Sequence, residues 1–193
     1  MAYTTLALVK ASLGIPTGTT TEDTAITAAI SAADATIDQY CGRTFETSAT
    51  TRVYIPRSSQ KLDIDDLASS TVTIKTDENQ DGTYETTLVA GTDYVLVGNA
   101  APYRIVTNVN RGWPLSLYGR PTIEVTGTFG YAAAVPDNVK QAALLLAARL
   151  YQRKASPLGF QAGAISELGP VRISRSDPDV GALLHGLRLL PVA

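Results

Sequence analysis

The acidic residues are those whose types and spacing come closest to a chemical site. The run Asp77-Glu78-Asn79-Gln80-Asp81-Gly82 matches the opening of an EF-hand calcium loop. Such a loop needs a bidentate glutamate at its twelfth position, which is Leu88 here, and a helix on each side, where this sequence predicts strands. A looser calcium site with Glu85 as an extra oxygen ligand stays open, beside the simpler interpretation as an acidic hairpin turn.

A second group of carboxylates comprises Asp63, Asp65 and Asp66. Paired carboxylates can act as general acid and base or can hold a divalent cation. No other cluster in the sequence is recognisable as its partner, so a solvated loop is favoured. A small cytoplasmic enzyme with an acidic site, using these residues or His185, stays open as an alternative to a structural role, as does a calcium-binding β module.

The remaining residue types indicate no catalytic machinery. His185 has no histidine, cysteine or glutamate at the spacing that metal ligands on a helix require. Cys41 is the only cysteine, which excludes an internal disulfide, and its place at the end of a predicted helix favours a buried apolar role. Nucleophile-elbow, P-loop and dinucleotide-binding patterns do not occur. We therefore expect no enzyme activity, no metal and no cofactor.

The composition is that of a globular protein. The 193 residues are 45% hydrophobic and 18% charged, which allows one good core, or one core and a smaller satellite. The net charge of −2 provides no electrostatic case for nucleic acid as the main partner. No apolar run approaches the roughly 18 residues that span a bilayer, and no secretory signal opens the chain, so we expect a soluble protein without a membrane partner.

The strongest helix pattern covers residues 136–154. Proline and aspartate suit its first turn, and basic residues suit its last turns. Its apolar stripe repeats at helical period and consists of Val139, Ala143, Leu146 and Leu150. We expect a long central helix that packs against a second helix ending at Cys41, before Gly42.

Between residues 50 and 131 the apolar period changes to two, which is typical of strands. Residues 71–76 and 83–87 predict a hairpin, with Asp81-Gly82 supplying the positive φ angles of its turn. The predicted fold class is α+β: a small helical bundle around the long helix 136–154, with an inserted antiparallel β module. The predicted domains are a helical core of residues 1–49 and 132–156, the β module of residues 50–131, and a docking segment of residues 157–193.

The C-terminal docking segment contains a predicted short strand near Val171 and a last helix that begins at Asp177-Pro178. Gly181 and Gly186 weaken this helix by roughly 1 kcal/mol each relative to alanine. Its apolar face is nevertheless strong, so we expect it to depend on a surface against which it packs.

Three stretches, taken in order, resemble the head–tail connector (adaptor, or head-completion) proteins of long-tailed bacteriophages. The first is YTTLALVKASLGI followed by DTAITAAISAADATIDQYCGRTF, the second is VTGTFGYAAAVPDNVKQAALLLAARLYQRK, and the third is RSDPDVGALL. Together they cover roughly half of the chain, and their order and spacing carry the resemblance.

The resemblance implies a structural virion protein without catalytic residues. It would form a ring, usually a dodecamer of identical subunits, between the portal vertex of the capsid and the tail, with double-stranded DNA passing through the centre without sequence-specific binding. Its other partners would be the portal protein and a tail-side stopper or tail-completion protein. The location would be the head–tail interface of the virion, and the host cytoplasm during assembly.

We expect the interfaces on the long helix and in the docking segment. The leucine stripe of the helix is wider than one packing seam, and the docking segment combines arginines with a weak apolar helix. The predicted interface residues are Leu144, Leu145, Arg149, Arg172, Arg175, Val180, Leu183, Leu184 and Leu187.

Overall fold

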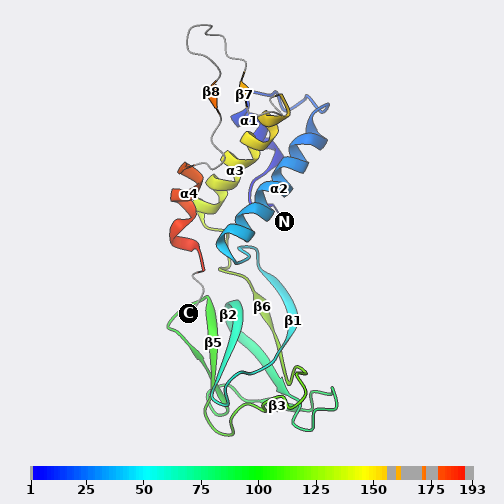
Figure 1. Ribbon diagram of the computed structural model, residues 1–193, viewed down its shortest axis with the longest axis vertical. Helices are drawn as coiled ribbons and strands as arrows, with labels where there is room; N and C mark the ends of the chain where they lie inside the picture. The colour runs from blue at the N-terminus through cyan, green and yellow to red at the C-terminus, as the bar shows by residue number, and fades with distance from the viewer. Residues whose placement is uncertain (1, 156–159, 162–170, 173–177, 190–193) are drawn as a thin grey trace. The chain divides into compact units, whose positions relative to one another are not determined.

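The computed structural model describes residues 2–155, 160–161, 171–172 and 178–189 (Figure 1). The chain divides into two compact units. Residues 1–42 and 135–193 form the first, which we call the helical unit, and residues 43–134 form the second, which we call the sheet unit.

The helical unit contains all the helices found among the described residues. They are α1 (Leu6–Ser12), α2 (Asp23–Cys41), α3 (Asp137–Gln152) and α4 (Pro178–Leu184), with the 3₁₀ turns η1 (Arg153–Ala155) and η2 (His185–Leu187). A two-stranded pair, β7 (Phe160–Gln161) and β8 (Val171–Arg172), belongs to the same unit. Among the described helices, none combines the length and apolar character that crossing a membrane requires.

Local signals in the sequence place the helix ends. The Thr5 hydroxyl oxygen accepts a hydrogen bond from the Leu8 N–H at 3.3 Å and caps α1. Gly42, with φ of 66°, ends α2 in the left-handed conformation that glycine adopts without a steric penalty. Pro136 directly precedes α3, so the chain enters that helix with a fixed φ angle.

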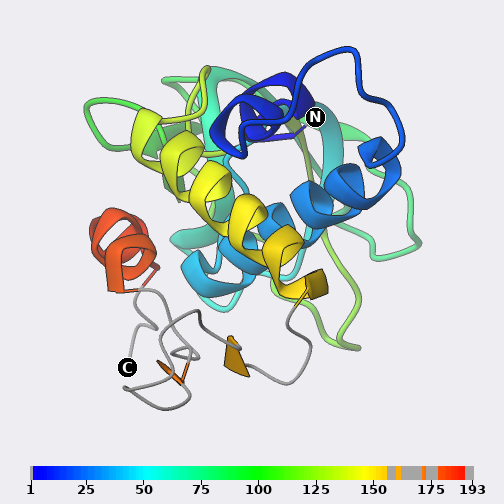
Figure 2. The same ribbon diagram turned by 90° about the horizontal axis from the view of Figure 1, so that it is seen from above.

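Helix α3 lies between α2 and α4 (Figure 2). Its buried residues are mostly alanines, which let the neighbouring helices approach closely. The core between α1, α2 and α3 is formed by Val9, Ile26, Ile30, Ala33 and Ala147.

The sheet unit is built on one antiparallel sheet of six strands. They are β1 (Ser48–Tyr54), β2 (Lys61–Thr76), β3 (Thr86–Leu88), β4 (Tyr94–Val97), β5 (Tyr103–Asn108) and β6 (Ile123–Phe129). The order is β1-β6-β2-β5-β4, with β3 paired to the end of β2 (Figure 1). Strand β2 is the longest, because its first part pairs with β5 and its second part pairs with β6.

A larger apolar core supports this sheet. Trp113, in the loop after β5, is 3% exposed and donates its indole N–H to the Gln60 carbonyl at 3.2 Å, so it closes the core without an unpaired polar atom. The core residues are Leu62, Ile64, Leu67, Ile74, Leu88, Tyr94, Val106, Trp113, Ile123, Val125 and Phe129.

The predicted fold class, a small helical bundle around a long central helix 136–154 with an inserted β module, is wrong. The helix covers only Asp137–Gln152, is shorter than α2, and has 7-residue helices, α1 and α4, as its other companions. The six-stranded sheet is the largest element instead. An apolar stripe shows that a helix is amphipathic, but it does not show how much of the core the rest of the chain supplies.

The sequence-based interpretation of Asp63, Asp65 and Asp66 as a solvated loop is also wrong, because all three lie in β2. The predicted hairpin is confirmed, with a shorter second strand, since Ile74 pairs with Leu88 and Thr76 pairs with Thr86. The positive φ angles of its turn belong to Gln80 and Gly82 rather than to Asp81.

Candidate functional site

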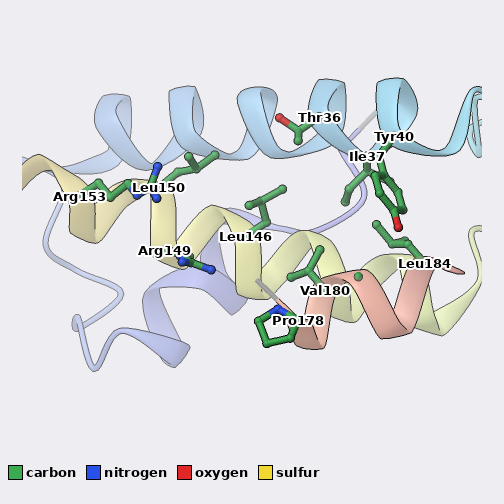
Figure 3. A pocket seen from close by; sticks show the side chains of 11 residues that line it. Thr36, Ile37, Tyr40, Leu146, Arg149, Leu150, Arg153, Pro178, Val180 and Leu184 are labelled. Atoms are coloured by element: carbon green, nitrogen blue, oxygen red, sulfur yellow. The ribbon is translucent and has the colours of Figure 1, made fainter. Parts of the chain in front are cut away.

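An apolar groove of about 450 Å³ lies between α2, α3 and α4 (Figure 3). The residues that line it are Thr36, Ile37, Tyr40, Leu146, Arg149, Leu150, Arg153, Pro178, Val180, Gly181 and Leu184. The groove exists because α4 is only two turns long and contains a glycine, Gly181, where a larger side chain would fill space. Such an unfilled, mostly apolar concavity is a candidate binding surface.

The two ends of the groove differ in chemistry. Arg149, in the last turn of α3, and Arg153, the first residue of η1, lie at one end, and Tyr40 and Leu184 lie at the other (Figure 3). At the tyrosine end, the Arg188 guanidinium carbon lies 5.6 Å from the centre of the Tyr40 ring, within the range of a cation–π contact. The groove therefore has an arginine end and an aromatic end.

A backbone hydrogen bond attaches the segment after α4 to the end of α2. The Leu189 N–H donates to the Cys41 carbonyl at 2.8 Å. A Cβ atom at Gly42 would lie 3.6 Å from the Leu189 Cβ, so the chain after α4 lies directly against the α2 terminus. The 3₁₀ turn η2 is thus held at both of its ends, by Leu184 in the core and by this bond.

The predicted interface residues fall into different environments. Arg149, Val180 and Leu184 come together in the groove. Leu144 is half-buried against the core between α1, α2 and α3, whereas Leu145 is exposed. Leu183 and Leu187 are half-buried. The backbone of Arg172 is in β8, and Arg175 lies outside the described residues.

Sequence reasoning missed most of the groove wall. The α2 wall consists of Thr36, Ile37 and Tyr40, and a helix brings Tyr40 beside the other two because it follows them by four and three positions. Leu146 and Leu150 on α3, and Arg149 of α3 with Arg153 of η1, have the same i, i+4 relation. These spacings can be seen in the sequence, but they do not show that α4 leaves a gap between α2 and α3.

The carboxylate oxygens of Asp77 and Asp81, in the acidic turn at residues 77–82, accept hydrogen bonds from backbone N–H groups of the protein. Asp77 is buried and accepts from the N–H groups of Gln80 at 2.6 Å and Gly82 at 2.8 Å. Asp81 accepts from the Thr83 N–H at 2.7 Å, and this bond holds the pKa of Asp81 below its usual value. The side-chain oxygens that an EF-hand loop directs at calcium are here engaged in closing a hairpin turn.

The carboxylates of β2 do not form one site either. The Asp65 carboxylate accepts hydrogen bonds from Arg52 at 2.7 Å and from the Tyr54 hydroxyl at 3.0 Å. Burial, together with the nearby Asp65 charge, raises the pKa of Tyr54 to about 12. Asp65 is therefore an ion-pair partner that faces solvent.

Asp66 points to the other side of the sheet, where a bulge in the pairing between β2 and β5 buries it. The Arg43 and Arg104 Nε atoms lie 3.4 Å and 3.3 Å from its oxygens. Burial nevertheless raises the pKa of Asp66, with the two arginines acting in the opposite direction. The arrangement is a buried ion cluster that joins the start of the sheet unit to β2 and β5.

Cys41 and His185 lie in different environments, and the buried thiol does not suit catalysis. Cys41 is completely buried at the end of α2, and His185 is exposed in η2. Among the described residues, no group of three or more histidine, cysteine, aspartate or glutamate side chains is arranged to hold a metal ion.

Comparisons with known proteins point to one family. The model of the family described as head completion protein matches residues 2–157, which is most of the chain. A comparison with curated proteins gives no match.

Three solved structures share the fold. The neck of an empty GTA particle computed with C6 symmetry contains a chain 23% identical, with a TM-score of 0.61, and the match covers 97% of this chain and 90% of that one. The neck of the native GTA particle computed with C12 symmetry gives 22% identity and a TM-score of 0.56, over 88% and 84% of the two chains. The virion of the native gene transfer agent (GTA) particle gives 23% identity and a TM-score of 0.56, over 97% and 90%.

Proposed function

The chain belongs to the head completion protein family, and we propose that it is a structural virion protein that forms a ring adaptor between the portal vertex of the capsid and the tail. The observation that carries this proposal is the family match over residues 2–157, which includes the whole sheet unit and helices α1 to α3. The groove and the engaged carboxylates agree with it, since they provide a surface for docking rather than groups poised for a reaction.

The proposed partners follow from the same premise. The solved structures of similar fold belong to particle necks computed with C6 and C12 symmetry. We infer a homo-oligomeric ring, a dodecamer, with the portal protein on one side and a tail-side stopper or tail-completion protein on the other. Double-stranded DNA would pass through the centre of the ring without sequence-specific contacts. A chain of net charge −2 has no electrostatic attraction to DNA that would support such contacts.

Two surfaces of the helical unit are the proposed contacts. Leu145 is an exposed leucine on α3, and we assign it to the neighbouring subunit of the ring. Leu183 and Leu187, on the accessible side of α4 and η2, are assigned to the portal-side or tail-side partner, together with Arg172 and Arg175 of the same C-terminal segment.

The test of the proposed function is removal of the gene from a virus or particle-producing strain that encodes this chain. We expect DNA-filled heads that lack tails, and restoration of complete particles when the chain is supplied in trans. Complete, infectious particles formed without the chain would contradict the proposal. Negative-stain images of the purified chain with portal protein provide the second readout, a ring at the portal vertex.

The ring contact is tested by Leu145→Asp. Because Leu145 is exposed, the variant should retain its helical circular dichroism and lose ring formation. Gln152→Asp is the matched control, since it adds the same charge two turns further along the exposed side of α3 and should leave the ring intact. Rings formed equally well by both variants would show that Leu145 is not part of the subunit contact.

A further inference from the structure

Strand β1 is an edge strand without the features that usually protect an edge. It lies at one end of the strand order and pairs with β6 alone (Figure 1). Proteins commonly protect such edges with short strands, β-bulges, proline or exposed charges, because unpaired backbone groups attract further strands. Strand β1 is seven residues long, pairs with β6 in an uninterrupted register and contains no proline.

The charged residue of β1 does not protect the edge either. The Arg52 guanidinium carbon lies 4.5 Å from the centre of the Phe129 ring, and its Nη1 donates to the Asp65 carboxylate at 2.7 Å. The side chain is thus engaged on the side of the sheet that carries the core. The opposite side of β1 presents an exposed, uncharged row of residues, which we call the outward row and which consists of Ala49, Thr51 and Val53.

The backbone of the outward row points away from β6. The Asp77 N–H donates to the Thr122 carbonyl at 2.9 Å, so even-numbered residues of β6 use their backbone groups on β2 and odd-numbered ones use theirs on β1. The odd-numbered residues of β6 lie opposite the even-numbered residues of Ser48–Tyr54. The N–H and C=O groups of the outward row, whose numbers are odd, consequently face the free edge.

The outward row fits a second copy of itself. Placing two β1 strands antiparallel about a twofold axis at Thr51 sets Thr51 opposite Thr51 of the second copy, and Ala49 opposite Val53. Both members of each pair direct their N–H and C=O groups at the other, so each pair can exchange two hydrogen bonds. The small alanine leaves room for the branched valine, which favours packing across the strands.

Charge also favours this register. Arg52 lies opposite Thr50 of the second copy, so the pairing sets no like charges against each other. A shift by two residues in one direction would set Arg52 opposite Arg52, and a shift in the other direction would take Val53 beyond the partner strand. A foreign strand would have to supply this pattern by its own sequence, whereas a second copy supplies it by symmetry.

The other edge of the sheet offers no comparable fit. On the outer side of β4 the Tyr94 carbonyl already accepts from the Gly91 N–H at 2.8 Å, and Ala90 forms a bridge with Tyr94. Strand β4 is only four residues long, which leaves the alternate residue Leu96 to face a neighbour. A pairing of β1 with β4 of a second copy would therefore make fewer hydrogen bonds than a pairing of two β1 strands.

We propose that β1 is a dimerisation edge, at which two copies of this chain pair antiparallel about a twofold axis at Thr51. A twofold contact uses the same surface on both copies and closes after two, whereas a ring around one axis is built from contacts between two different surfaces. The dimer therefore belongs to the unassembled chain, and it covers an edge that would otherwise recruit other strands. It is separate from the ring contact assigned to Leu145 and does not depend on the proposed function.

The size of the contact predicts a weak dimer. A strand of seven residues is about 24 Å long. An edge contact of this length buries less than the roughly 1,200 Å² at which stable interfaces begin. We therefore expect a dissociation constant on the order of 10 µM, so that the dimer dissociates on dilution.

The first experiment is sedimentation velocity of the purified chain between about 1 and 300 µM, a range that brackets this dissociation constant. We expect a species of two chains that grows with concentration. A ring differs from the dimer in size, and Leu145→Asp should remove the ring and retain the dimer. Absence of a two-chain species over the whole range overturns the inference.

Two double variants test the register. Ala49→Lys with Val53→Lys sets lysine opposite lysine twice in the dimer and should weaken it about ten-fold or more. Ala49→Glu with Val53→Lys changes the same two exposed positions but sets glutamate opposite lysine, so its dissociation constant should stay within about three-fold of the native value. Equal dissociation constants for the two double variants overturn the inference.

A disulfide tests the twofold axis. Facing residues of a hydrogen-bonded pair have Cα atoms about 5.5 Å apart, which a disulfide can bridge, so Thr51→Cys should give an oxidised dimer. Thr126→Cys is the control, since it is exposed on the neighbouring strand but lies three strand spacings, about 14 Å, from its counterpart in the dimer. The native Cys41 is buried and should not interfere. Equal oxidation of the two variants to dimers overturns the inference.

Discussion

The helical unit and the sheet unit bury their apolar residues in different ways. The sheet unit packs eleven buried side chains, including Trp113 and Phe129, into one core. The helical unit relies on small side chains at its closest helix contacts, and the buried alanines are Ala29, Ala33, Ala142, Ala143 and Ala147. Small residues bring helices close together, but they leave little volume with which to fill the space beside a short third helix.

The apolar groove of the helical unit and an exposed apolar loop of the sheet unit differ for the same reason. The groove of the helical unit is concave, because α4 is too short to cover α2 and α3 completely. The loop of residues 109–120 in the sheet unit is convex, because a filled core and hydrogen bonds from Gln80 hold Leu117 and Tyr118 outward. The concave surface results from incomplete packing and the convex one from hydrogen bonds to the loop, so substitutions should affect them differently.

The largest effect is expected in the sheet unit. Trp113→Ala should lower the free energy of unfolding by about 3–5 kcal/mol, because it leaves a large cavity in the core and removes the indole hydrogen bond to the Gln60 carbonyl. Urea unfolding followed by circular dichroism measures the change, and Leu117→Ala is the control, with an effect below about 0.5 kcal/mol. A small effect of Trp113→Ala would mean that the two units do not differ in packing as described.

A smaller effect is expected at the groove. Leu184→Ala should cost about 2 kcal/mol, at the lower end for a buried leucine, because the adjacent groove already lacks packing atoms on one side. Hydrogen exchange should show faster exchange of the α4 amides, while the strands of the sheet unit keep their protection. Leu183→Ala, at a half-buried position on the same helix, is the control. Equal losses from both variants would contradict the assignment of Leu184 as the anchor of α4.

Lys10 tests a polar contact within the helical unit. Its ammonium is buried, forms an ion pair with Asp23, and donates to the Thr19 carbonyl at 2.7 Å. Lys10→Met should cost about 1–3 kcal/mol, because the methionine fills the space but leaves these acceptors without their donor. Thermal unfolding of the variant measures this, with Lys140→Met, an exposed lysine, as the control. A Lys10 variant as stable as the control would show that solvent replaces the lysine.

The smallest effect is expected in the acid range. The Lys154 ammonium donates to Glu22 at 2.5 Å, and this hydrogen bond holds the pKa of the Glu22 carboxyl below its usual value. A depressed pKa in the folded state means that the stability contribution is present above the unfolded-state pKa and is lost as the pH falls through the folded-state value.

The measurement is the thermal midpoint between pH 6 and pH 3, the range that brackets the ordinary glutamate pKa near 4.3. Glu22→Gln should lie slightly below the native chain at pH 6, and the two should converge at the acid end. The Lys154 side chain is 59% exposed and that of Glu22 is 33% exposed, so salt should reduce the difference. A difference that grows as the pH falls would have the wrong sign for this contact.

Features encoded over a few residues were predictable from the sequence. Gly42 at the end of α2, Pro136 before α3 and the hairpin turn before Gly82 act within one turn of the chain, where the conformational preference of a single residue dominates. The family resemblance rests on the same local patterns, and the match over residues 2–157 confirms it.

Tertiary structure alone decided the rest. The acidic residues of β2 were predicted to lie in a loop because the sequence shows no partner for them, yet Arg52 pairs with Asp65, and Arg43 and Arg104 pair with Asp66, in a strand. Gln80 carries no local signal for bracing a loop 35 to 37 residues away. The groove depends on how three helices from distant parts of the chain meet. In each case the deciding free energy comes from contacts between residues far apart in the sequence, which no local pattern contains.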